Sequence, residues 1–205
     1  MSKVSYLVSP LCVCCGDSLP GNTEGDHFCE NCLRTPPSFS VARGIALYQN
    51  PVKQLLHNLK YNFDTTTLGP LLLIAQSSDF STFESCDIIL PVPLHSKRLK
   101  RRGMNQALFL ARLFFPERKE DIYTDVLVRE RPTISQTSLD LQGRKKNLSD
   151  AFTVKNIDII TNKVICLVDD VFTTGATVEE CSRSIIAAGG TEVRVLTLAR
   201  VVTRR

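Results

Sequence analysis

The chain has 205 residues, and 43% of them are hydrophobic, which is typical of a globular protein with one full core and a small additional module. No apolar run approaches the roughly 20 residues that a membrane-spanning helix requires. The chain does not begin with a basic segment followed by an apolar one, so we expect no signal peptide and a cytoplasmic location. In that compartment the eight cysteines favour metal binding or buried thiols over disulfides.

The net charge of +4 is unevenly distributed along the chain. One basic cluster lies within residues 97–102, a second lies within residues 144–146, and Arg129 and Arg131 add positive charge between them. Such clusters are most often solvated surface. They also favour an anionic ligand when other residues point to a phosphate site.

The first 37 residues contain two pairs of cysteines at metal-ligand spacing. Cys12 and Cys15 form one CxxC pair, and Cys29 and Cys32 form the other. Gly16 follows the first pair and allows a tight turn whose backbone amides face a thiolate. Four thiolates in this arrangement are typical of a zinc ribbon, so residues 1–37 are predicted to be a zinc-binding module. Few large apolar side chains lie in this segment, so the metal should supply most of its folding free energy.

Two alternatives exist for these cysteines, and two further residues complicate the site. A redox-active CxxC or an iron–sulfur site would use the same residue type, but a thioredoxin-like redox motif requires a βαβ context that is absent here. Cys14 is a fifth thiol within the first pair, and His27 lies two residues before Cys29. We expect neither Cys14 nor His27 to be a ligand, because the Cys12/Cys15 pair already has the required spacing.

A proline-rich segment at residues 35–38 separates this module from a second domain over residues 38–205. In that domain, apolar patterns predict strands that alternate with helices. The expected strands are 44–48, 87–90, 125–128, 164–168 and 193–201, and the expected helices are 52–61, 68–76, 104–115, 139–148 and a segment from 178 to about 188. This alternation predicts an α/β fold with a mostly parallel sheet flanked by helices.

The buried strand at residues 164–168 ends in two acidic residues, Asp169 and Asp170. A loop of small and hydroxylic residues, 173–177, then opens a helix. Backbone N–H groups of such a loop can bind a phosphate, while the two carboxylates can accept hydrogen bonds from vicinal hydroxyls or lie near Mg²⁺. Together they fit a ribose 5-phosphate. The alternative is a capped helix entry without a ligand. The chain lacks the glycine and lysine pattern of a nucleoside-triphosphate loop and the G-x-G-x-x-G of a dinucleotide site.

Two more segments have the composition of anion sites. Residues 91–95 end a predicted strand and lead into a basic turn with Arg98 and Arg102, which suits a pyrophosphate. Residues 136–152 contain Arg144 and read equally well as an ordinary basic surface helix.

The sequence from Val168 to Thr177 resembles the 5-phosphoribosyl-1-pyrophosphate (PRPP) signature of type I phosphoribosyltransferases. The resemblance implies that Asp169 and Asp170 are the catalytic acidic pair and contact the ribose 2- and 3-hydroxyls. It also implies that the following loop surrounds the 5-phosphate through Thr173, Thr174, Gly175, Ala176 and Thr177. The implied fold is the type I phosphoribosyltransferase fold, and the implied cofactor beside structural Zn²⁺ is Mg²⁺ bound with PRPP.

Four motifs in this order resemble the ComF family over nearly the whole chain. They are the CxxCG…CxxC ribbon, PVPL-x₃-R-x₃-RG-x-NQ, Q-x₂-L-x₄-R-x₂-N-x₃-AF and VDDV-x-TTG-x-T. The resemblance implies a pyrophosphate loop at residues 91–94 and a hood over the site at residues 129–144. The substrate-binding residues would then include Pro91, Val92, Pro93, Leu94, Arg98, Arg102 and Arg144. Two residues depart from the family pattern. Met104 stands where the family often has an aromatic residue, and Cys14 is an extra thiol.

The ComF family includes competence proteins of naturally transformable bacteria. The resemblance therefore implies a PRPP-binding protein that handles incoming single-stranded DNA at the cytoplasmic face of the inner membrane. It also allows peripheral contact with that membrane and with other competence proteins. The alternative is an active PRPP-dependent phosphoribosyltransferase with an undefined acceptor. Thr173 stands where purine-salvage enzymes often have an acidic residue, and threonine is a poor general base, so turnover stays an open question.

Overall fold

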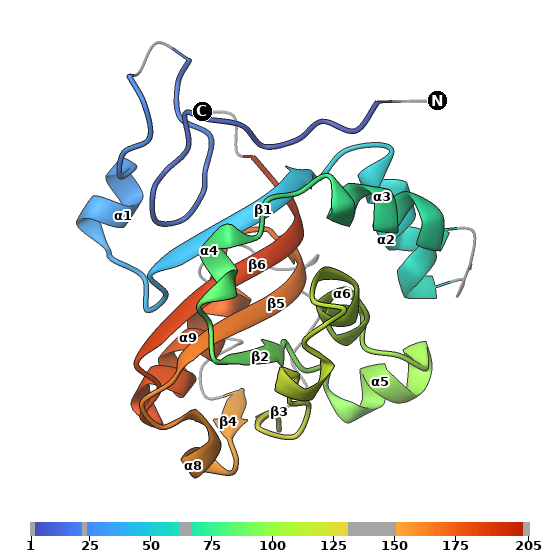
Figure 1. Ribbon diagram of the computed structural model, residues 1–205, viewed down its shortest axis with the longest axis vertical. Helices are drawn as coiled ribbons and strands as arrows, with labels where there is room; N and C mark the ends of the chain where they lie inside the picture. The colour runs from blue at the N-terminus through green and yellow to red at the C-terminus, as the bar shows by residue number, and fades with distance from the viewer. Residues whose placement is uncertain (1–2, 22–23, 62–66, 131–150, 203–205) are drawn as a thin grey trace.

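The computed structural model describes residues 3–21, 24–61, 67–130 and 151–202 (Figure 1). Among these residues no helix is both long enough and apolar enough to cross a bilayer. The elements, in chain order, are α1 (Glu30–Arg34), β1 (Val41–Leu47), α2 (Val52–Tyr61), α3 (Leu68–Gln76), α4 (Ser81–Glu84), β2 (Ile88–Pro91), α5 (Ser96–Arg102), α6 (Gln106–Phe114), a 3₁₀ turn (Lys119–Asp121), β3 (Leu127–Arg129), β4 (Phe152–Val154), α8 (Ile157–Ile160), β5 (Val164–Phe172), α9 (Ala176–Ala187) and β6 (Glu192–Arg200).

A parallel sheet of four strands, in the order β1-β6-β5-β2, is the centre of the described structure. Alternate residues of β5 face opposite layers, as the period of a strand requires. Ile165 and Leu167 pack with α9, whereas Cys166 and Val168 pack with α2, α3 and α6. Figure 1 shows these helices on either side of the sheet. The prediction of an α/β fold with a parallel sheet flanked by helices is confirmed.

Most predicted elements appear close to their expected bounds. The helices expected at 52–61 and 68–76 are α2 and α3, and the strand expected at 193–201 is β6. Strand β5 runs to Phe172, so Asp169 and Asp170 lie within its last residues rather than after it. The helix expected at 139–148 lies outside the described residues.

Helix α5 replaces the basic turn that was expected after the strand at 87–90. His95 begins it, because its Nδ1 accepts a hydrogen bond from the Lys97 N–H at 3.2 Å. Gly103 ends it in the left-handed conformation, with φ 71°. Between these caps the sequence is almost entirely lysine, arginine and leucine, which are good helix formers. The caps therefore turn a basic segment into a short helix.

The cysteine-rich segment packs directly on the sheet rather than standing apart from it. Gly16 approaches β1 so closely that a Cβ on it would lie 2.4 Å from the Ala42 carbonyl oxygen, and its φ is +68°. After α1, the linker docks on α9, where the Ser38 N–H and hydroxyl donate to the Glu179 carboxylate at 2.9 and 2.7 Å. The division of the chain at residue 37 stays a prediction.

Candidate functional site

A cleft of about 300 Å³ lies at the carboxyl ends of the parallel strands. This is where open α/β sheets bind their ligands, because strand ends and helix N-termini converge there. Its walls come from the end of β1, α2, the β2–α5 segment, β3, β5 and the first turn of α9. The lining residues are Tyr48, Lys60, Val92, Pro93, Leu94, Arg98, Arg102, Asn105, Gln106, Ala107, Arg129, Asp169, Asp170, Val171, Phe172, Thr173, Gly175, Thr177 and Val178.

The two carboxylates sit in different environments although they are adjacent in sequence. Asp170 forms an ion pair with Lys60 of α2, and both side chains are mostly buried. Asp169 accepts a hydrogen bond from the Asp170 N–H at 2.8 Å. Burial, and then the charge of Asp170, raises the pKa of Asp169 to about 8. Burial alone would lower the pKa of Lys60, but the charges of Asp170 and Asp169 outweigh it and raise that pKa.

The loop after β5 has the geometry of an anion site. Gly175 is the N-cap of α9, with φ 78°, and a Cβ there would lie 2.7 Å from the Phe172 ring. Only glycine fits both constraints. The helix begins at Ala176, so the N–H groups of its first turn, which have no acceptor within the helix, and the positive end of the helix dipole lie at the cleft, where Thr177 lines it. The Thr174 hydroxyl accepts from the Ala176 N–H at 3.4 Å and supports the turn.

The opposite wall is held in place by an asparagine that joins β2 to α6. The Asn105 side-chain amide donates to the Val92 carbonyl at 3.1 Å, and its oxygen caps α6 by accepting from the Ala107 N–H at 3.0 Å. Strand β2 in turn is fixed to β5, because the Val92 N–H donates to the Val168 carbonyl at 2.8 Å. The two walls of the cleft therefore share one rigid framework.

Three arginines line the same cleft as the acidic pair. Arg98 and Arg102 lie one helical turn apart on α5, and Arg102 donates to the Gln106 side chain at 3.2 Å. Arg129, at the end of β3, lies over the Phe152 ring at 5.1 Å. Burial and the nearby charge of Arg98 lower the pKa of Arg129. A site that contains both guanidinium groups and carboxylates suits a ligand with both phosphates and hydroxyls.

Most of the predicted site residues line this cleft. Thr174 and Ala176 belong to the loop and its helix but are not among the lining residues. Pro91 is the last residue of β2 and also does not line the cleft, and Arg144 lies outside the described residues. The others line it: Asp169, Asp170, Thr173, Gly175, Thr177, Val92, Pro93, Leu94, Arg98 and Arg102. Their contacts with a ligand stay predictions.

Sequence reasoning did not place Tyr48 and Lys60 at the site. It gave Arg129 as part of a basic cluster and, through the family resemblance, as the first residue of the hood over the site, and the structure places this arginine in the lining of the cleft. The available signal for Lys60 was its position beside the apolar stripe of α2, four residues after the buried Leu56. A lysine bordering a buried face must either extend to solvent or pair with a buried acid, and here it pairs with Asp170.

The predicted cysteines converge on a second site. The sulfur atoms of Cys12, Cys15, Cys29 and Cys32 all lie within 4.8 Å of one another. The Cys15 and Cys29 sulfurs are 3.8 Å apart, which matches the edge of about 3.8 Å expected for a tetrahedron with metal–sulfur bonds of about 2.3 Å. This cluster fits a structural metal ion. Although burial opposes it, N–H groups including those of Cys29 and Cys15 lower the pKa of Cys12 to about 7, which favours the thiolate.

Cys14 and His27 lie beside this cluster but are not part of it. The Cys14 thiol is buried and points to the Phe39 carbonyl at 3.8 Å. His27 is exposed, and its Nδ1 lies 3.3 Å from the Gly25 carbonyl. The four thiols of the two CxxC pairs are therefore the ligand set that the structure brings together.

Comparison with known proteins gives relatives over nearly the full length of the chain, although no protein-family model matches it. Competence protein F of Haemophilus influenzae is 32% identical over 199 residues, which cover 93% of this chain and 85% of that protein. The DNA utilization protein YhgH of Escherichia coli K12 is 31% identical and covers 98% and 88%, respectively. Competence protein ComFC of Bacillus subtilis is 25% identical and covers 92% and 75%.

Replacing Cys29 by Ser should abolish stoichiometric metal binding, because three thiolates leave the tetrahedron open. Metal content by mass spectrometry should fall well below one ion per chain, and limited proteolysis should cut within residues 3–34. The matched control is Cys14→Ser, which changes a buried thiol outside the cluster and should keep the metal. Equal loss of metal in both variants would contradict the assignment.

The raised pKa of Asp169 predicts that the ligand-free protein loses stability as the pH rises. The folded state holds the proton more tightly than the unfolded state, so this contribution is complete below pH 3.8 and is lost as the pH approaches about 8. Asp169→Asn should flatten this part of the dependence of the urea midpoint on pH. The control Asp158→Asn, on the exposed part of α8, should keep the wild-type slope.

Proposed function

Because this chain belongs to the ComF family, with relatives at 30% identity or more over most of its length, we propose that it binds PRPP in the cleft and takes part in the handling of incoming single-stranded DNA during natural transformation. The observation that carries the proposal is the meeting of the acidic pair, the α9 loop and the α5 arginines in one cleft. Each has the chemistry for one part of PRPP.

The proposed ligand spans the cleft from α9 to α5. Its 5-phosphate would lie at the N–H groups of the loop and first turn of α9. The ribose hydroxyls would donate to Asp169 and Asp170, and the pyrophosphate would meet Arg98 and Arg102. Mg²⁺ would accompany the pyrophosphate, since this cation prefers substrate phosphates and retains water ligands.

We propose zinc as the metal of the four-cysteine cluster. Four thiolates in a closed tetrahedron are typical of structural zinc, and they leave no open position for a substrate. The metal would hold together a segment with few large apolar side chains. Its role would be to shape the surface that packs on β1.

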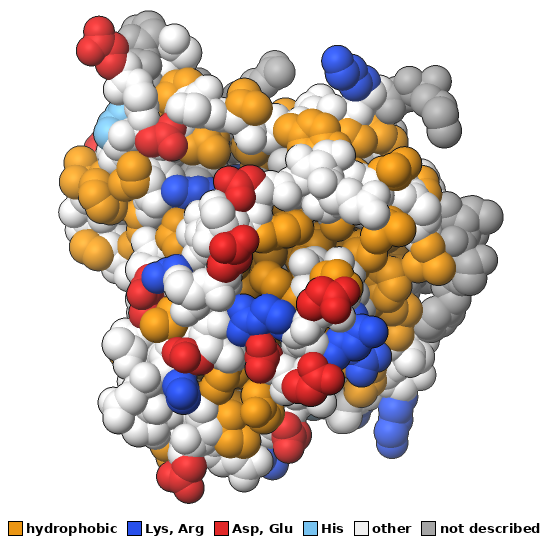
Figure 2. Space-filling model, in the orientation of Figure 1, with side chains coloured by type: hydrophobic (Ala, Val, Ile, Leu, Met, Phe, Trp, Pro, Cys, Tyr) orange, Lys and Arg blue, Asp and Glu red, His pale blue; other side chains and the backbone are white. Residues whose placement is uncertain are grey.

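Helix α5 supports the DNA part of the proposal because its basic residues point in two directions. Arg98 and Arg102 line the cleft, whereas Lys97, Lys100 and Arg101 are exposed. The face of the molecule in Figure 2 carries acidic and basic side chains side by side. A phosphate backbone would instead find three exposed basic side chains close together on the outer side of α5. Two of the relatives are named as competence proteins and one as a DNA utilization protein.

The test of PRPP binding is titration calorimetry with Mg²⁺ present, at a pH above the pKa of about 8 of Asp169 so that this carboxylate is ionised. A hydrogen bond to a charged acceptor is worth about 1.5–3 kcal/mol, against about 0.5–1.5 kcal/mol for a neutral one. The double change Asp169→Asn and Asp170→Asn should therefore weaken PRPP binding at least about tenfold. The exposed Asp158→Asn should leave the affinity unchanged. Equal affinity of the double variant and the wild type would refute the placement, and consumption of PRPP would favour the transferase alternative.

The test of DNA binding separates the two sides of α5. Lys100→Glu with Arg101→Glu should weaken single-stranded DNA binding and lower its salt slope, because each neutralised phosphate releases about 0.7 counterions. PRPP binding should persist, since Arg98 and Arg102 are retained. The control, Lys119→Glu with Lys155→Glu, makes the same charge change at exposed sites elsewhere. Equal weakening by both pairs would mean that only net charge matters.

A further inference from the structure

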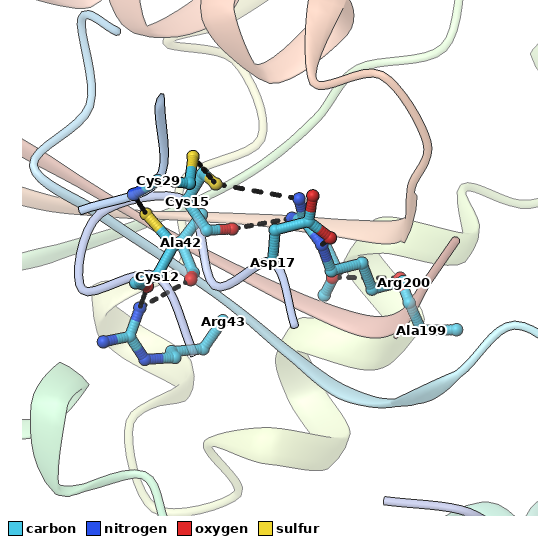
Figure 3. A network of polar contacts seen from close by, with 9 residues as sticks. Cys12, Cys15, Asp17, Cys29, Ala42, Arg43, Ala199 and Arg200 are labelled. Carbon is cyan, nitrogen blue, oxygen red and sulfur yellow. Dashed lines mark hydrogen bonds and ion pairs between the residues drawn. The ribbon is translucent and has the colours of Figure 1, made fainter. Parts of the chain in front are cut away.

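Arg200, the last residue of β6, lies between the four-cysteine cluster and the anion-binding loop. This residue is only 5% exposed. Toward the cluster, its guanidinium donates to the Cys15 carbonyl at 2.6 Å and to the Asp17 carboxylate at 3.3 Å, and it lies 3.8 Å from the Cys15 sulfur (Figure 3). One buried cation therefore holds the turn Cys12–Asp17, called the knuckle below, which contains the predicted metal ligand Cys15.

The other side of the same guanidinium contacts the Phe172 ring. The Arg200 Cζ lies 4.2 Å from the ring centroid, which is within the range of a cation–π interaction. Phe172 is buried, and a second aromatic ring, that of Phe39, packs edge-on against it at 6.1 Å. The ring is thus fixed from two sides.

Phe172 in turn supports the loop. The backbone of Gly175 lies so close to the ring that a Cβ there would lie 2.7 Å from its Cζ and 3.0 Å from its Cε1. Gly175 is the N-cap of α9. The ring therefore determines how close to β5 the loop that would surround the phosphate can lie. Cys15, Arg200, Phe172 and Gly175 form an unbroken series of contacts.

We propose that Arg200 is a positioning residue that makes zinc binding at the cysteine cluster and sugar-phosphate binding in the cleft mutually favourable. This inference rests on the proposed function. Zinc fixes Cys15, Cys15 fixes the guanidinium, and the guanidinium holds Phe172 against the loop in the arrangement that binds the phosphate. Two binding events coupled in this way must strengthen each other by the same factor.

Arg43 offers a matched control, because it also holds the cysteine knuckle. Its guanidinium donates to the carbonyls of Val13 at 3.1 Å and Cys12 at 3.5 Å, and Figure 3 shows it on the opposite side of the cluster from Arg200. It does not line the cleft. Arg43 therefore shares the contact to the knuckle with Arg200 but not the contact to Phe172.

The experiment measures zinc retention against a colorimetric chelator at equilibrium, with and without saturating PRPP and Mg²⁺. In the wild type, PRPP should raise the chelator concentration needed to remove half of the zinc, on the order of fivefold. Arg200→Met should still purify with zinc but lose the effect of PRPP. Arg43→Met should hold zinc less tightly and keep the effect of PRPP in full.

A purely structural role of Arg200 would lower zinc retention equally with and without PRPP, leaving their ratio unchanged. That ratio therefore decides the proposal. If Arg200→Met does not fold, Phe172→Leu serves instead, because it keeps the contacts of Arg200 to the knuckle and removes the ring. An unchanged ratio in the variant that folds, or no effect of PRPP on zinc in a wild type that binds PRPP, would overturn the inference alone. Absence of PRPP binding by the zinc-loaded wild type would overturn the proposed function as well.

Discussion

The pairing of β5 between β2 and β6 is the constraint on which the candidate site depends. Parallel pairing brings the carboxyl ends of these strands to one edge, and the buried residues of β5 exclude water from both of its faces. The acidic pair emerges from the last residues of this strand, so its carboxylates are half-buried before any ligand is present. Burial explains the raised pKa of Asp169. It also explains why the surrounding groups must provide so much positive charge, since a buried carboxylate requires compensation.

The cysteine-rich segment shows how a small module can be stabilised by its neighbour. It contributes Cys12, Cys14 and Cys32 to the same hydrophobic cluster as β1, β5 and α9. Arginines from the last residue of β6 and from β1 donate to the carbonyls of its first knuckle. These contacts satisfy polar groups that a free-standing ribbon would expose to water. A metal bound by the four cysteines would therefore stabilise the same few residues that docking on the sheet already holds.

Local signals in the sequence were sufficient for the elements and for much of the candidate site. The apolar stripe of α2, the continuous apolar run of β5 and the spacing of the CxxC pairs each express short-range geometry, and each appears as expected. The contributions of Lys60 and Arg129 could not be predicted in this way. Their side chains reach the cleft through the tertiary fold. Helix α2 shares a hydrophobic cluster with Cys166 and Val168 of β5, and β3 pairs with β4, which contacts α9. Helix α5 was missed because it depends on two caps, His95 and Gly103, whose effect is hard to read in a run of basic residues.

The ion pair between Lys60 and Asp170 gives the ligand-free cleft an ammonium group of its own. A sugar that enters the cleft therefore does not meet a bare carboxylate. In the proposed complex its hydroxyls would replace an existing partner, and the ammonium group on the last turn of α2 would be released inside the cleft that also holds the phosphates of the sugar. Entry of that ligand would in this sense be an exchange of partners, in which Lys60 passes from a carboxylate to a phosphate. A neutral sugar would take the place of the lysine without offering it a new anion, so under the proposed function the ion pair would favour phosphorylated sugars over neutral ones.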